Sequence, residues 1–286
     1  MSQGFSDKLL SWFDQHGRKH LPWQQNQTPY RVWLSEIMLQ QTQVATVIPY
    51  YQRFTQQFSD VASLAAAEED EVLHLWTGLG YYARARNLQK AAKQLVQEHN
   101  GEFPANLEQL QNLPGIGRST AGAIMALAFK LPGTILDGNV KRVLARRYGI
   151  DGWPGHTAVS NDLWAIAEEL SPDARIADYT QAMMDMGATL CTRSKPKCEI
   201  CPFSTDCIAY RDERIKELPG KKPKKTIPVR QTLMLVVSNP RGELLLKKRP
   251  SQGLWGGLWS FPECKEQEVN NQLQMLQIEE SQISTI

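Results

Sequence analysis

Leu113-Pro-Gly-Ile-Gly-Arg-Ser-Thr-Ala-Gly122 is a glycine-rich turn between two segments of helical periodicity. Gly115 and Gly117 permit close approach of the backbone to a ligand, and amides at the start of the following helix can donate hydrogen bonds to a phosphate oxygen. The same pattern also fits a turn that joins two helices and binds no ligand. The stretch predicts a helical fold. Whether the turn binds a ligand has to be inferred from the rest of the sequence.

The chain is helical in pattern on both sides of this turn, from about residue 5 to about residue 210. Thr28 and Pro29 suit the N-cap and first position of a helix that reaches about Gln41. Further helices are expected at 44–58, 69–76, 87–99, 119–129, 139–148, 159–170 and 176–190. The sequence therefore predicts a mainly α fold.

Four cysteines follow the last of these helices with the spacing C-x6-C-x2-C-x5-C: Cys191, Cys198, Cys201 and Cys207. Thiolates that lie so close together usually hold a metal. A [4Fe-4S] cluster takes four cysteine ligands, whereas structural zinc usually pairs two short C-x2-C knuckles, of which this chain has one. We expect a [4Fe-4S] cluster, with zinc or ordinary buried thiols as the alternatives.

The charge of the chain is uneven, although its net value is only +2. Residues 191–230 carry eleven Lys and Arg against five Asp and Glu, a net charge of +6. Three of these cations, Arg193, Lys195 and Lys197, lie between the first two cysteines. The basic residues either offset the negative charge of a metal cluster or face DNA phosphates.

The start of the chain lacks the pattern of a signal peptide. The longest apolar stretch, residues 121–129, is too short to cross a bilayer. Clustered thiolates suit a reducing compartment. We therefore expect a cytoplasmic protein that does not bind a membrane.

The composition changes near residue 216, where a Lys- and Pro-rich linker is expected at 216–230. Beyond it, the residues around Asn239-Pro-Arg-Gly242 predict a β-hairpin, and 259–261 predicts another strand. The segment 231–286 is short for a domain of its own. We expect a helical domain at 1–215, the linker, and an incomplete α/β domain at 231–286.

Three motifs and the cysteine loop together resemble a known family. The motifs are Leu34-Ser-Glu-Ile-Met-Leu-Gln-Gln-Thr42, the turn at 113–122 and Leu136-Asp-Gly-Asn-Val-Lys-Arg-Val-Leu-Ala-Arg146. Their order is similar to that of the helix-hairpin-helix DNA glycosylase superfamily, and within it the adenine DNA glycosylases, over about residues 5 to 265. The resemblance implies a two-lobed helix-hairpin-helix glycosylase fold with a [4Fe-4S] loop, followed by an incomplete Nudix-like domain.

The implied reaction is hydrolysis of the N-glycosidic bond of adenine mispaired with 8-oxoguanine or guanine in double-stranded DNA. We expect a monomer associated with the nucleoid. The Phe-Ser-His loop with which the family contacts 8-oxoguanine is not found in this sequence.

The resemblance assigns two catalytic carboxyl groups. Glu36 corresponds to the general acid that protonates the flipped adenine, and Asp137 to the carboxylate that faces C1′ of the sugar. From the residues alone, apolar neighbours of Glu36 predict partial burial and a raised pKa, while an isolated Glu is usually a solvated surface group. Asp137 also suits the N-cap of the helix that it begins.

The resemblance also implies which residues contact DNA. Gln41 and Tyr81 correspond to residues that wedge into the duplex, although Gln41 also fits polar surface and Tyr81 a core aromatic. The remaining substrate-binding candidates are Trp23, Gln24, Gln40, Thr42, Ser119, Asn139 and Gln181. Candidates for DNA phosphates are Gly115, Gly117, Arg193, Lys195 and Lys197.

The residue at position 119 distinguishes two reaction types, base removal with strand cleavage and base removal by hydrolysis alone. Relatives that also cleave the strand have a Lys at this position, whose amine forms a Schiff base with C1′. Ser119 therefore predicts a glycosylase that uses water as the final nucleophile. The alternatives are a bifunctional pyrimidine glycosylase/AP lyase of the same superfamily and a non-catalytic DNA-binding iron–sulfur protein.

Overall fold

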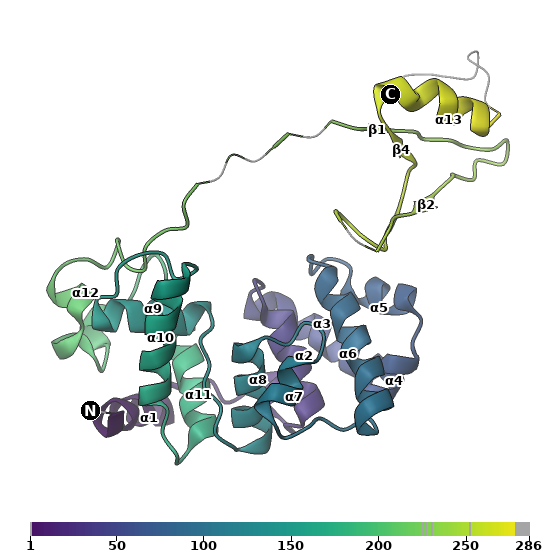
Figure 1. Cartoon of the computed structure of the whole chain (residues 1–286). Coiled ribbons are helices and arrows are strands. Elements are labelled where there is room, and N and C mark those ends of the chain that lie inside the picture. The colour runs from purple at the N-terminus through teal and green to yellow at the C-terminus, as the bar shows by residue number, and fades with distance from the viewer. Residues whose placement is uncertain (1, 225, 227, 230, 252, 278–286) are drawn as a thin grey trace. The chain divides into compact units, whose positions relative to one another are not determined.

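The predicted helices are present in the computed structural model, most with bounds within two residues of the expectation (Figure 1). The Oγ1 atom of Thr28 accepts a hydrogen bond from the backbone nitrogen of Arg31 (3.2 Å) and so caps α2 (Pro29–Leu39), as predicted. Two predicted helices, 119–129 and 176–190, end in a π-helical turn, which widens the last part of each.

The structure describes residues 2–224, 226, 228, 229, 231–251 and 253–277. The described chain divides into two compact units, 1–223 and 224–286. The division lies inside the segment that the sequence assigns to the linker, and the domain limits given above stay predictions. Residues 225, 227 and 230 of that linker and residues 252 and 278–286 of the predicted C-terminal domain lie outside the described residues.

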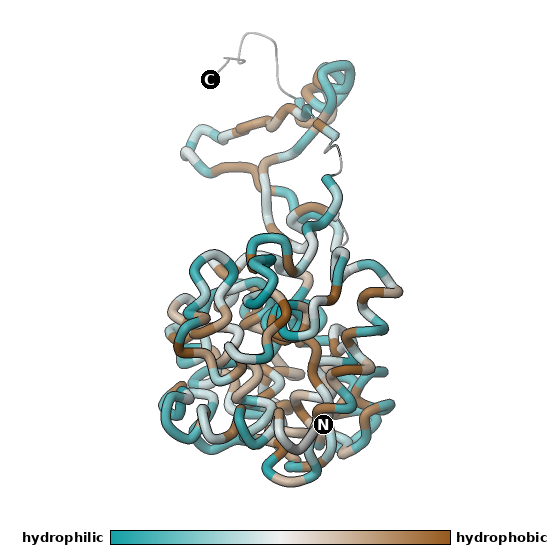
Figure 2. The backbone as a smooth tube through the Cα atoms, turned by 90° about the vertical axis from the view of Figure 1, so that its left-hand side faces the viewer, coloured by the Kyte–Doolittle hydropathy of each residue, from teal (hydrophilic) through white to brown (hydrophobic). Residues whose placement is uncertain are grey.

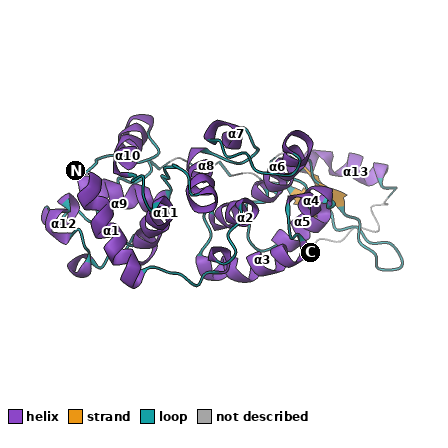
Figure 3. Cartoon of the chain, turned by 90° about the horizontal axis from the view of Figure 1, so that it is seen from below, coloured by secondary structure: helices purple, strands orange, loops and turns teal. Residues whose placement is uncertain are grey.

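The first unit has two lobes that lie side by side (Figures 1 and 3). One lobe consists of α2, α3 (Val44–Gln57), α4 (Val61–Ala66), α5 (Glu69–Trp76), α6 (Ala83–His99), α7 (Leu107–Gln111) and α8 (Arg118–Ile124), with η1 (Pro22–Gln24) and the π turn η2 (Met125–Phe129). The short helices α4 and α7 had no clear signal in the sequence. The turn Leu113–Gly117 connects α7 to α8, which confirms that two helices flank it.

The second lobe combines the start of the chain with residues after 137, so that α1 packs against α10 and α11. Its elements are α1 (Ser2–His16), α9 (Gly138–Tyr148), α10 (Thr157–Leu170), α11 (Ile176–Asp185), η3 (Met186–Leu190), η4 (Cys198–Ile200), η5 (Ser204–Asp206) and α12 (Ile208–Arg211). Residues 191–207 form the cysteine loop, which lies next to α9 and α12.

Amphipathic helices account for the core of this unit. Hydrophobic and hydrophilic residues alternate along the helices (Figure 2), and the apolar faces meet inside each lobe. Trp33 of α2 and Trp76 of α5 are fully buried, as is Leu9 of α1. Glu36 lies on α2, the same helix as Trp33. The candidate acid is therefore held by an element that is anchored in the core.

The C-terminal unit contains the only strands among the described residues (Figure 3). Its elements are β1 (Leu233–Met234), β2 (Lys247–Lys248), β3 (Trp259–Ser260), β4 (Glu263–Cys264), η6 (Glu266–Glu268) and α13 (Val269–Met275). The pairs β1–β4 and β2–β3 are antiparallel, and a single bridge joins Ser238 to Leu244 around the predicted turn. The expected hairpin is thus present only near its turn.

No described helix combines the length and the apolar composition needed to cross a membrane.

Candidate active site and metal centre

A cleft of about 1120 Å³ lies within the helical unit. Ten of the residues that the sequence nominates line it: Trp23, Glu36, Gln40, Gln41, Thr42, Ser119, Asp137, Asn139, Gln181 and Arg193. They come from η1, α2, the segment after α2, α8, the start of α9, α11 and the cysteine loop. The two π turns contribute Leu127 and Ala188. The packing of both lobes therefore brings distant motifs together at one site.

Glu36 lies on the inner side of α2 and is half-buried, because the cleft leaves part of its carboxyl group accessible. It accepts no hydrogen bond from any described residue. Burial and the nearby negative charge of Asp137 raise the pKa of Glu36 to about 8. Glu36 is therefore mainly protonated at neutral pH, as the apolar neighbours in the sequence predicted.

Asp137 is the N-cap of α9. Its Oδ1 atom accepts hydrogen bonds from the backbone nitrogens of Asn139 (3.0 Å) and Val140 (2.8 Å), and its Oδ2 atom accepts one from Nδ2 of Asn139 (3.1 Å). Burial raises the pKa of Asp137, while these hydrogen bonds and the positive charge of Arg142 act in the opposite direction. The predicted capping role is confirmed.

The two carboxyl groups thus have different surroundings in one cleft. Asp137 accepts three hydrogen bonds that favour its charged form, whereas Glu36 accepts none and so has nothing to oppose the effect of burial on its pKa. A protonated acid beside a carboxylate is the arrangement that separates the roles of acid and stabiliser in glycoside hydrolysis.

Arg142 connects this site to the cysteine loop. Its Nη2 atom donates to Oδ1 of Asn139 (2.8 Å) and to the carbonyl of Gly187 (2.7 Å), and its Nε atom donates to the carbonyl of Cys191 (2.8 Å). Asn139 is therefore held between Arg142 and Asp137. The sequence analysis did not single out Arg142, although it lies one helical turn after Asn139, where a contact is expected.

Asp185, Gln181 and Arg18 form a hydrogen-bonded polar cluster at the side of the cleft. Asp185, fully buried, accepts hydrogen bonds from Nε2 of Gln181 (2.9 Å) and from the backbone nitrogen (2.7 Å) and guanidinium (2.6 Å) of Arg18. Arg18 lines the cleft. Neither Arg18 nor Asp185 was predicted, because 167 residues separate them and only packing brings them together.

Gln24 does not line the cleft. Its side chain accepts a hydrogen bond from the backbone nitrogen of Leu21 (3.0 Å) and donates one to the carbonyl of Arg18 (2.7 Å), so it shapes the turn η1. Trp23 lines the cleft and also packs edge-on against Tyr51 in the core. Oγ of Ser119 accepts a hydrogen bond from the backbone nitrogen of Leu136 (2.9 Å) and so supports the residue before Asp137.

The two candidate wedge residues share an unusual backbone conformation. Gln41 and Tyr81 have φ values of 59° and 50°, a region that residues other than glycine rarely adopt. Gln41 is exposed and 61% of Tyr81 is exposed, so Tyr81 is not a core aromatic. Tyr81 does not line the cleft itself.

Gly115, in the turn before α8, also requires a positive φ (80°), and a Cβ atom there would lie 2.9 Å from Cβ of Asn87. Gly117 is the N-cap of α8. Lys195 and Lys197 are exposed in the cysteine loop, outside the cleft. Their contacts with DNA phosphates stay a prediction.

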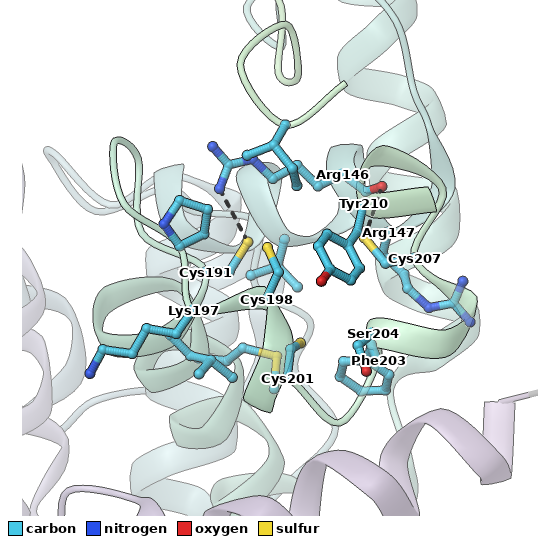
Figure 4. A pocket seen from close by; sticks show the side chains of 15 residues that line it. Arg146, Arg147, Cys191, Lys197, Cys198, Cys201, Phe203, Ser204, Cys207 and Tyr210 are labelled. Carbon is cyan, nitrogen blue, oxygen red and sulfur yellow. Dashed lines mark hydrogen bonds between the residues drawn. The ribbon is translucent and has the colours of Figure 1, made fainter. Parts of the chain in front are cut away.

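The four cysteines line one small cavity, together with Arg146, Lys197 and Phe203 (Figure 4). Nη1 of Arg146 lies 3.4 Å from Sγ of Cys191, and Sγ of Cys207 lies 3.5 Å from the carbonyl oxygen of Arg146. Arg146 is 2% exposed, and its other donors bind the carbonyls of Thr192, Arg193 and Leu218. A buried guanidinium thus neutralises negative charge at the cysteine ligands.

The donor set fits a cluster better than a single ion. Within the described residues, no three His, Cys, Asp or Glu side chains are arranged to hold one metal ion, whereas the four thiols surround a cavity. Burial, together with the neighbouring thiols, raises the pKa of Cys201 to about 11. Four close thiolates therefore require a positively charged iron core, which is what a [4Fe-4S] cluster supplies.

Family comparisons cover most of the chain. Residues 34–169 match the HhH-GPD superfamily base excision DNA repair protein, residues 191–207 the iron–sulfur binding domain of endonuclease III, and residues 233–286 the NUDIX domain. The expectations of a helix-hairpin-helix glycosylase fold, a [4Fe-4S] cluster and a Nudix-like C-terminal domain are confirmed.

Two curated relatives illustrate the similarity. The chain is 44% identical over 264 residues to the adenine DNA glycosylase of Buchnera aphidicola subsp. Acyrthosiphon pisum (strain APS), covering 92% of this chain and 75% of that protein. It is 40% identical over 309 residues to the adenine DNA glycosylase of Mus musculus, covering 90% of this chain and 60% of that protein.

Solved structures show the same fold. A thermostable thymine-DNA glycosylase superposes with a TM-score of 0.67 at 28% identity, covering 74% of this chain and 97% of that chain. A non-covalent endonuclease III–DNA complex gives a TM-score of 0.62 at 23% identity, covering 74% and 95% of the two chains.

Proposed function

Because the chain belongs to the adenine DNA glycosylases of the HhH-GPD superfamily, we propose that it removes adenine mispaired with 8-oxoguanine or guanine from duplex DNA by hydrolysis of the N-glycosidic bond. The observation that carries the proposal is the pairing of Glu36 and Asp137 in one cleft. The cleft of about 1120 Å³ has room for an extruded nucleotide.

Glu36 acts as the general acid. With a pKa of about 8 it holds a proton at neutral pH and donates it to a ring nitrogen of the flipped adenine. The base then leaves as a neutral molecule instead of a poor anionic leaving group. The absence of hydrogen-bond donors to Glu36 among the described residues supports this role, since such donors would favour the ionised form.

Asp137 stabilises the positive charge that develops at C1′ of the sugar. Its hydrogen bonds from Asn139 and Val140 keep the carboxylate in one orientation. Water completes the hydrolysis, and Ser119 has no amine with which to form a Schiff base. The supported reaction is therefore that of a monofunctional glycosylase.

Recognition of the duplex is assigned to several surfaces of the helical unit. Gln41 and Tyr81 fill the space left by the flipped base, and Gln40 and Thr42 lie beside them. Gln181, Trp23 and Asn139 form the walls of the base pocket, and Gln24 acts through the turn that carries Trp23. Gly115, Gly117, Arg193, Lys195 and Lys197 bind phosphates.

The [4Fe-4S] cluster, held by Cys191, Cys198, Cys201 and Cys207, cross-links the basic loop when it is bound. The proposed enzyme acts as a monomer, because the reaction as proposed uses no residue of a second copy of the chain. The reducing compartment that such thiolates need, together with a DNA substrate, supports a place in the cytoplasm at the nucleoid.

Single-turnover release of adenine tests the proposal. We expect release from duplexes with adenine opposite 8-oxoguanine or guanine, and far slower release from the matched duplex with adenine opposite thymine. Duplexes with oxidised pyrimidines serve as a control for the alternative chemistry. Strand cleavage at a pyrimidine without adenine release would overturn the proposal.

A further inference from the structure

Arg84, in the first turn of α6, links two segments that are far apart in the sequence. Its Nη1 atom lies within hydrogen-bonding distance of the carbonyl oxygens at the end of α2, those of Ile37 (2.9 Å), Met38 (2.9 Å) and Gln40 (2.7 Å). Carbonyl groups at a helix C-terminus lack partners within the helix. Arg84 supplies hydrogen-bond donors to these carbonyl groups at the end of α2, just before Gln41.

The second terminal nitrogen of the guanidinium, Nη2, reaches the segment 79–81. Nη2 of Arg84 donates to the carbonyls of Leu79 (3.1 Å) and Gly80 (3.2 Å), next to Tyr81, and lies 3.3 Å from Oγ1 of Thr42. Oγ1 of Thr42 in turn donates to the carbonyl of Gln40 (3.3 Å). One planar group thus holds residues 40–42 and 79–81 to each other.

Both segments need such support because of their backbone. Gln41 and Tyr81 have positive φ values without being glycine, a conformation that persists only when its surroundings hold it. The guanidinium carbon of Arg84 also lies 5.6 Å from the ring centroid of exposed Tyr81 and 5.3 Å from that of buried Trp76. These contacts favour one orientation of the Tyr81 ring relative to the core.

We propose that Arg84 is a positioning residue that holds residues 40–42 and 79–81 as one rigid pair, so that Gln41 and Tyr81 enter the duplex together when the base is flipped. The inference rests on the proposed function of these two residues as wedges. The inference gives Arg84 no contact with phosphate or base, because both of its terminal nitrogens are directed at backbone oxygens and at Thr42 and its Nε atom is buried. Its effect is therefore on the distortion of the duplex and not on affinity.

The test compares Arg84→Lys with Leu95→Ala, a substitution at a fully buried position on the same helix, where the apolar side chain makes no hydrogen bond to either segment. A lysine has one ammonium group and cannot bridge both segments in this way. The probe is a duplex with a hydrolysis-resistant 2′-fluoro adenosine opposite 8-oxoguanine and 2-aminopurine beside it, whose fluorescence rises on unstacking. Single-turnover adenine release and affinity for the duplex are measured in parallel, at a temperature at which circular dichroism shows each protein folded.

We expect Arg84→Lys to lose most of the fluorescence rise and to slow adenine release about tenfold or more, with duplex affinity within about threefold of the wild type. Leu95→Ala should keep the rise even if it unfolds at a lower temperature. If Arg84→Lys keeps the rise and the rate to the same extent as Leu95→Ala, the inference is wrong. Should Arg84→Lys not fold, Arg84→Gln takes its place with the same readouts.

The wild-type protein separates this inference from the proposed function. If it neither raises the fluorescence nor releases adenine, the proposed function fails. If it does both, only the behaviour of the Arg84 variants decides the role of Arg84.

Discussion

Single side chains decide which of the two carboxyl groups in the cleft keeps a proton. Asp137 accepts three hydrogen bonds from Asn139 and Val140, while Glu36 accepts none among the described residues. Hydrogen bonds to a carboxylate favour ionisation, so the donors at Asp137 oppose the effect of burial on its pKa, while no donor opposes that effect at Glu36. The candidate acid and the candidate stabiliser are therefore distinguished by their donors and not by residue type.

The pH dependence of the reaction follows from this difference. We expect the single-turnover rate of adenine release to fall as the pH rises through about 8, because Glu36 must be protonated to act. The measurement is a rate profile with duplex affinity determined at each pH. Glu36→Gln should bind the duplex but release almost no adenine at any pH, and Glu102→Gln, an exposed control, should behave as wild type. A wild-type rate that stays constant through pH 9 would count against Glu36 as the acid.

The same group makes the fold less stable at high pH. The folded pKa of Glu36 is about 8 against 4.5 for the free side chain, so between these values the folded protein holds a proton that the unfolded chain has released. The free energy of unfolding therefore falls as the pH rises through this window. We expect Glu36→Gln to be more stable than wild type at pH 8 by the order of 1 to 3 kcal/mol.

Urea unfolding measures this difference. It should shrink as the pH falls and largely disappear below about pH 4.5, where Glu36 becomes neutral in the unfolded chain as well as in the folded protein. A Glu36→Gln protein that is less stable than wild type at pH 8 would show that the carboxyl group is not under electrostatic strain.

At the scale of elements, the start of α9 has two functions. Asp137 caps the helix and also presents its carboxylate to the cleft. The two functions can be separated because asparagine keeps the accepting oxygen of the cap but not the charge.

We therefore expect Asp137→Asn to lose most of its adenine release and to keep its stability within about 1 kcal/mol, whereas Asp137→Ala should lose both the activity and about 1 kcal/mol from the missing cap. Single-turnover rates and urea unfolding of both variants test this. Near-normal release by Asp137→Asn would mean that the charge is not needed.

The start of α8 offers a test of reaction type. Ser119 lines the cleft and supports Leu136, so a lysine there would reach the site but leave the Leu136 amide without its acceptor. We expect Ser119→Lys to gain a covalent adduct with DNA that borohydride traps, at a stability cost of about 1 kcal/mol. Ser119→Ala has the same stability cost without an amine and should give no adduct. If Ser119→Lys also gives none, this position alone does not set lyase activity.

At the scale of the whole molecule, the metal centre and the cleft share α9. The carbonyl of Cys191 accepts a hydrogen bond from Arg142, which in turn holds Asn139. The cysteine loop and the candidate catalytic carboxylate are thus parts of one packed lobe, although 54 residues separate Cys191 from Asp137. The C-terminal unit is a separate body with several exposed apolar side chains, among them Leu254 and Trp259.

We expect the purified protein to be brown with about four irons per chain. Cys198→Ser should lose affinity for duplex DNA by about tenfold while it still shows the helical circular dichroism of the wild type, because the cluster organises a basic loop. Cys264→Ser, a buried cysteine in the C-terminal unit, is the matched control and should keep its iron. Unchanged binding by Cys198→Ser across a salt series would contradict this role.

The sequence by itself determined the features that depend on neighbours along the chain. Thr28 caps α2 and Asp137 caps α9 because a cap bonds to amides within three residues. The spacing of the four cysteines indicated a metal centre, and the apolar neighbours of Glu36 indicated its burial. The motif order identified the family, and with it the expected fold.

Only the tertiary structure decided which distant groups meet. Arg18 pairs with Asp185 across 167 residues, and Arg84 reaches the end of α2 across 44 to 47 residues. No pattern along the chain indicates these contacts, because they depend on how helix faces pack. The raised pKa of Glu36 also depends on the tertiary structure, since burial and the charge of Asp137 act on it only in the folded protein.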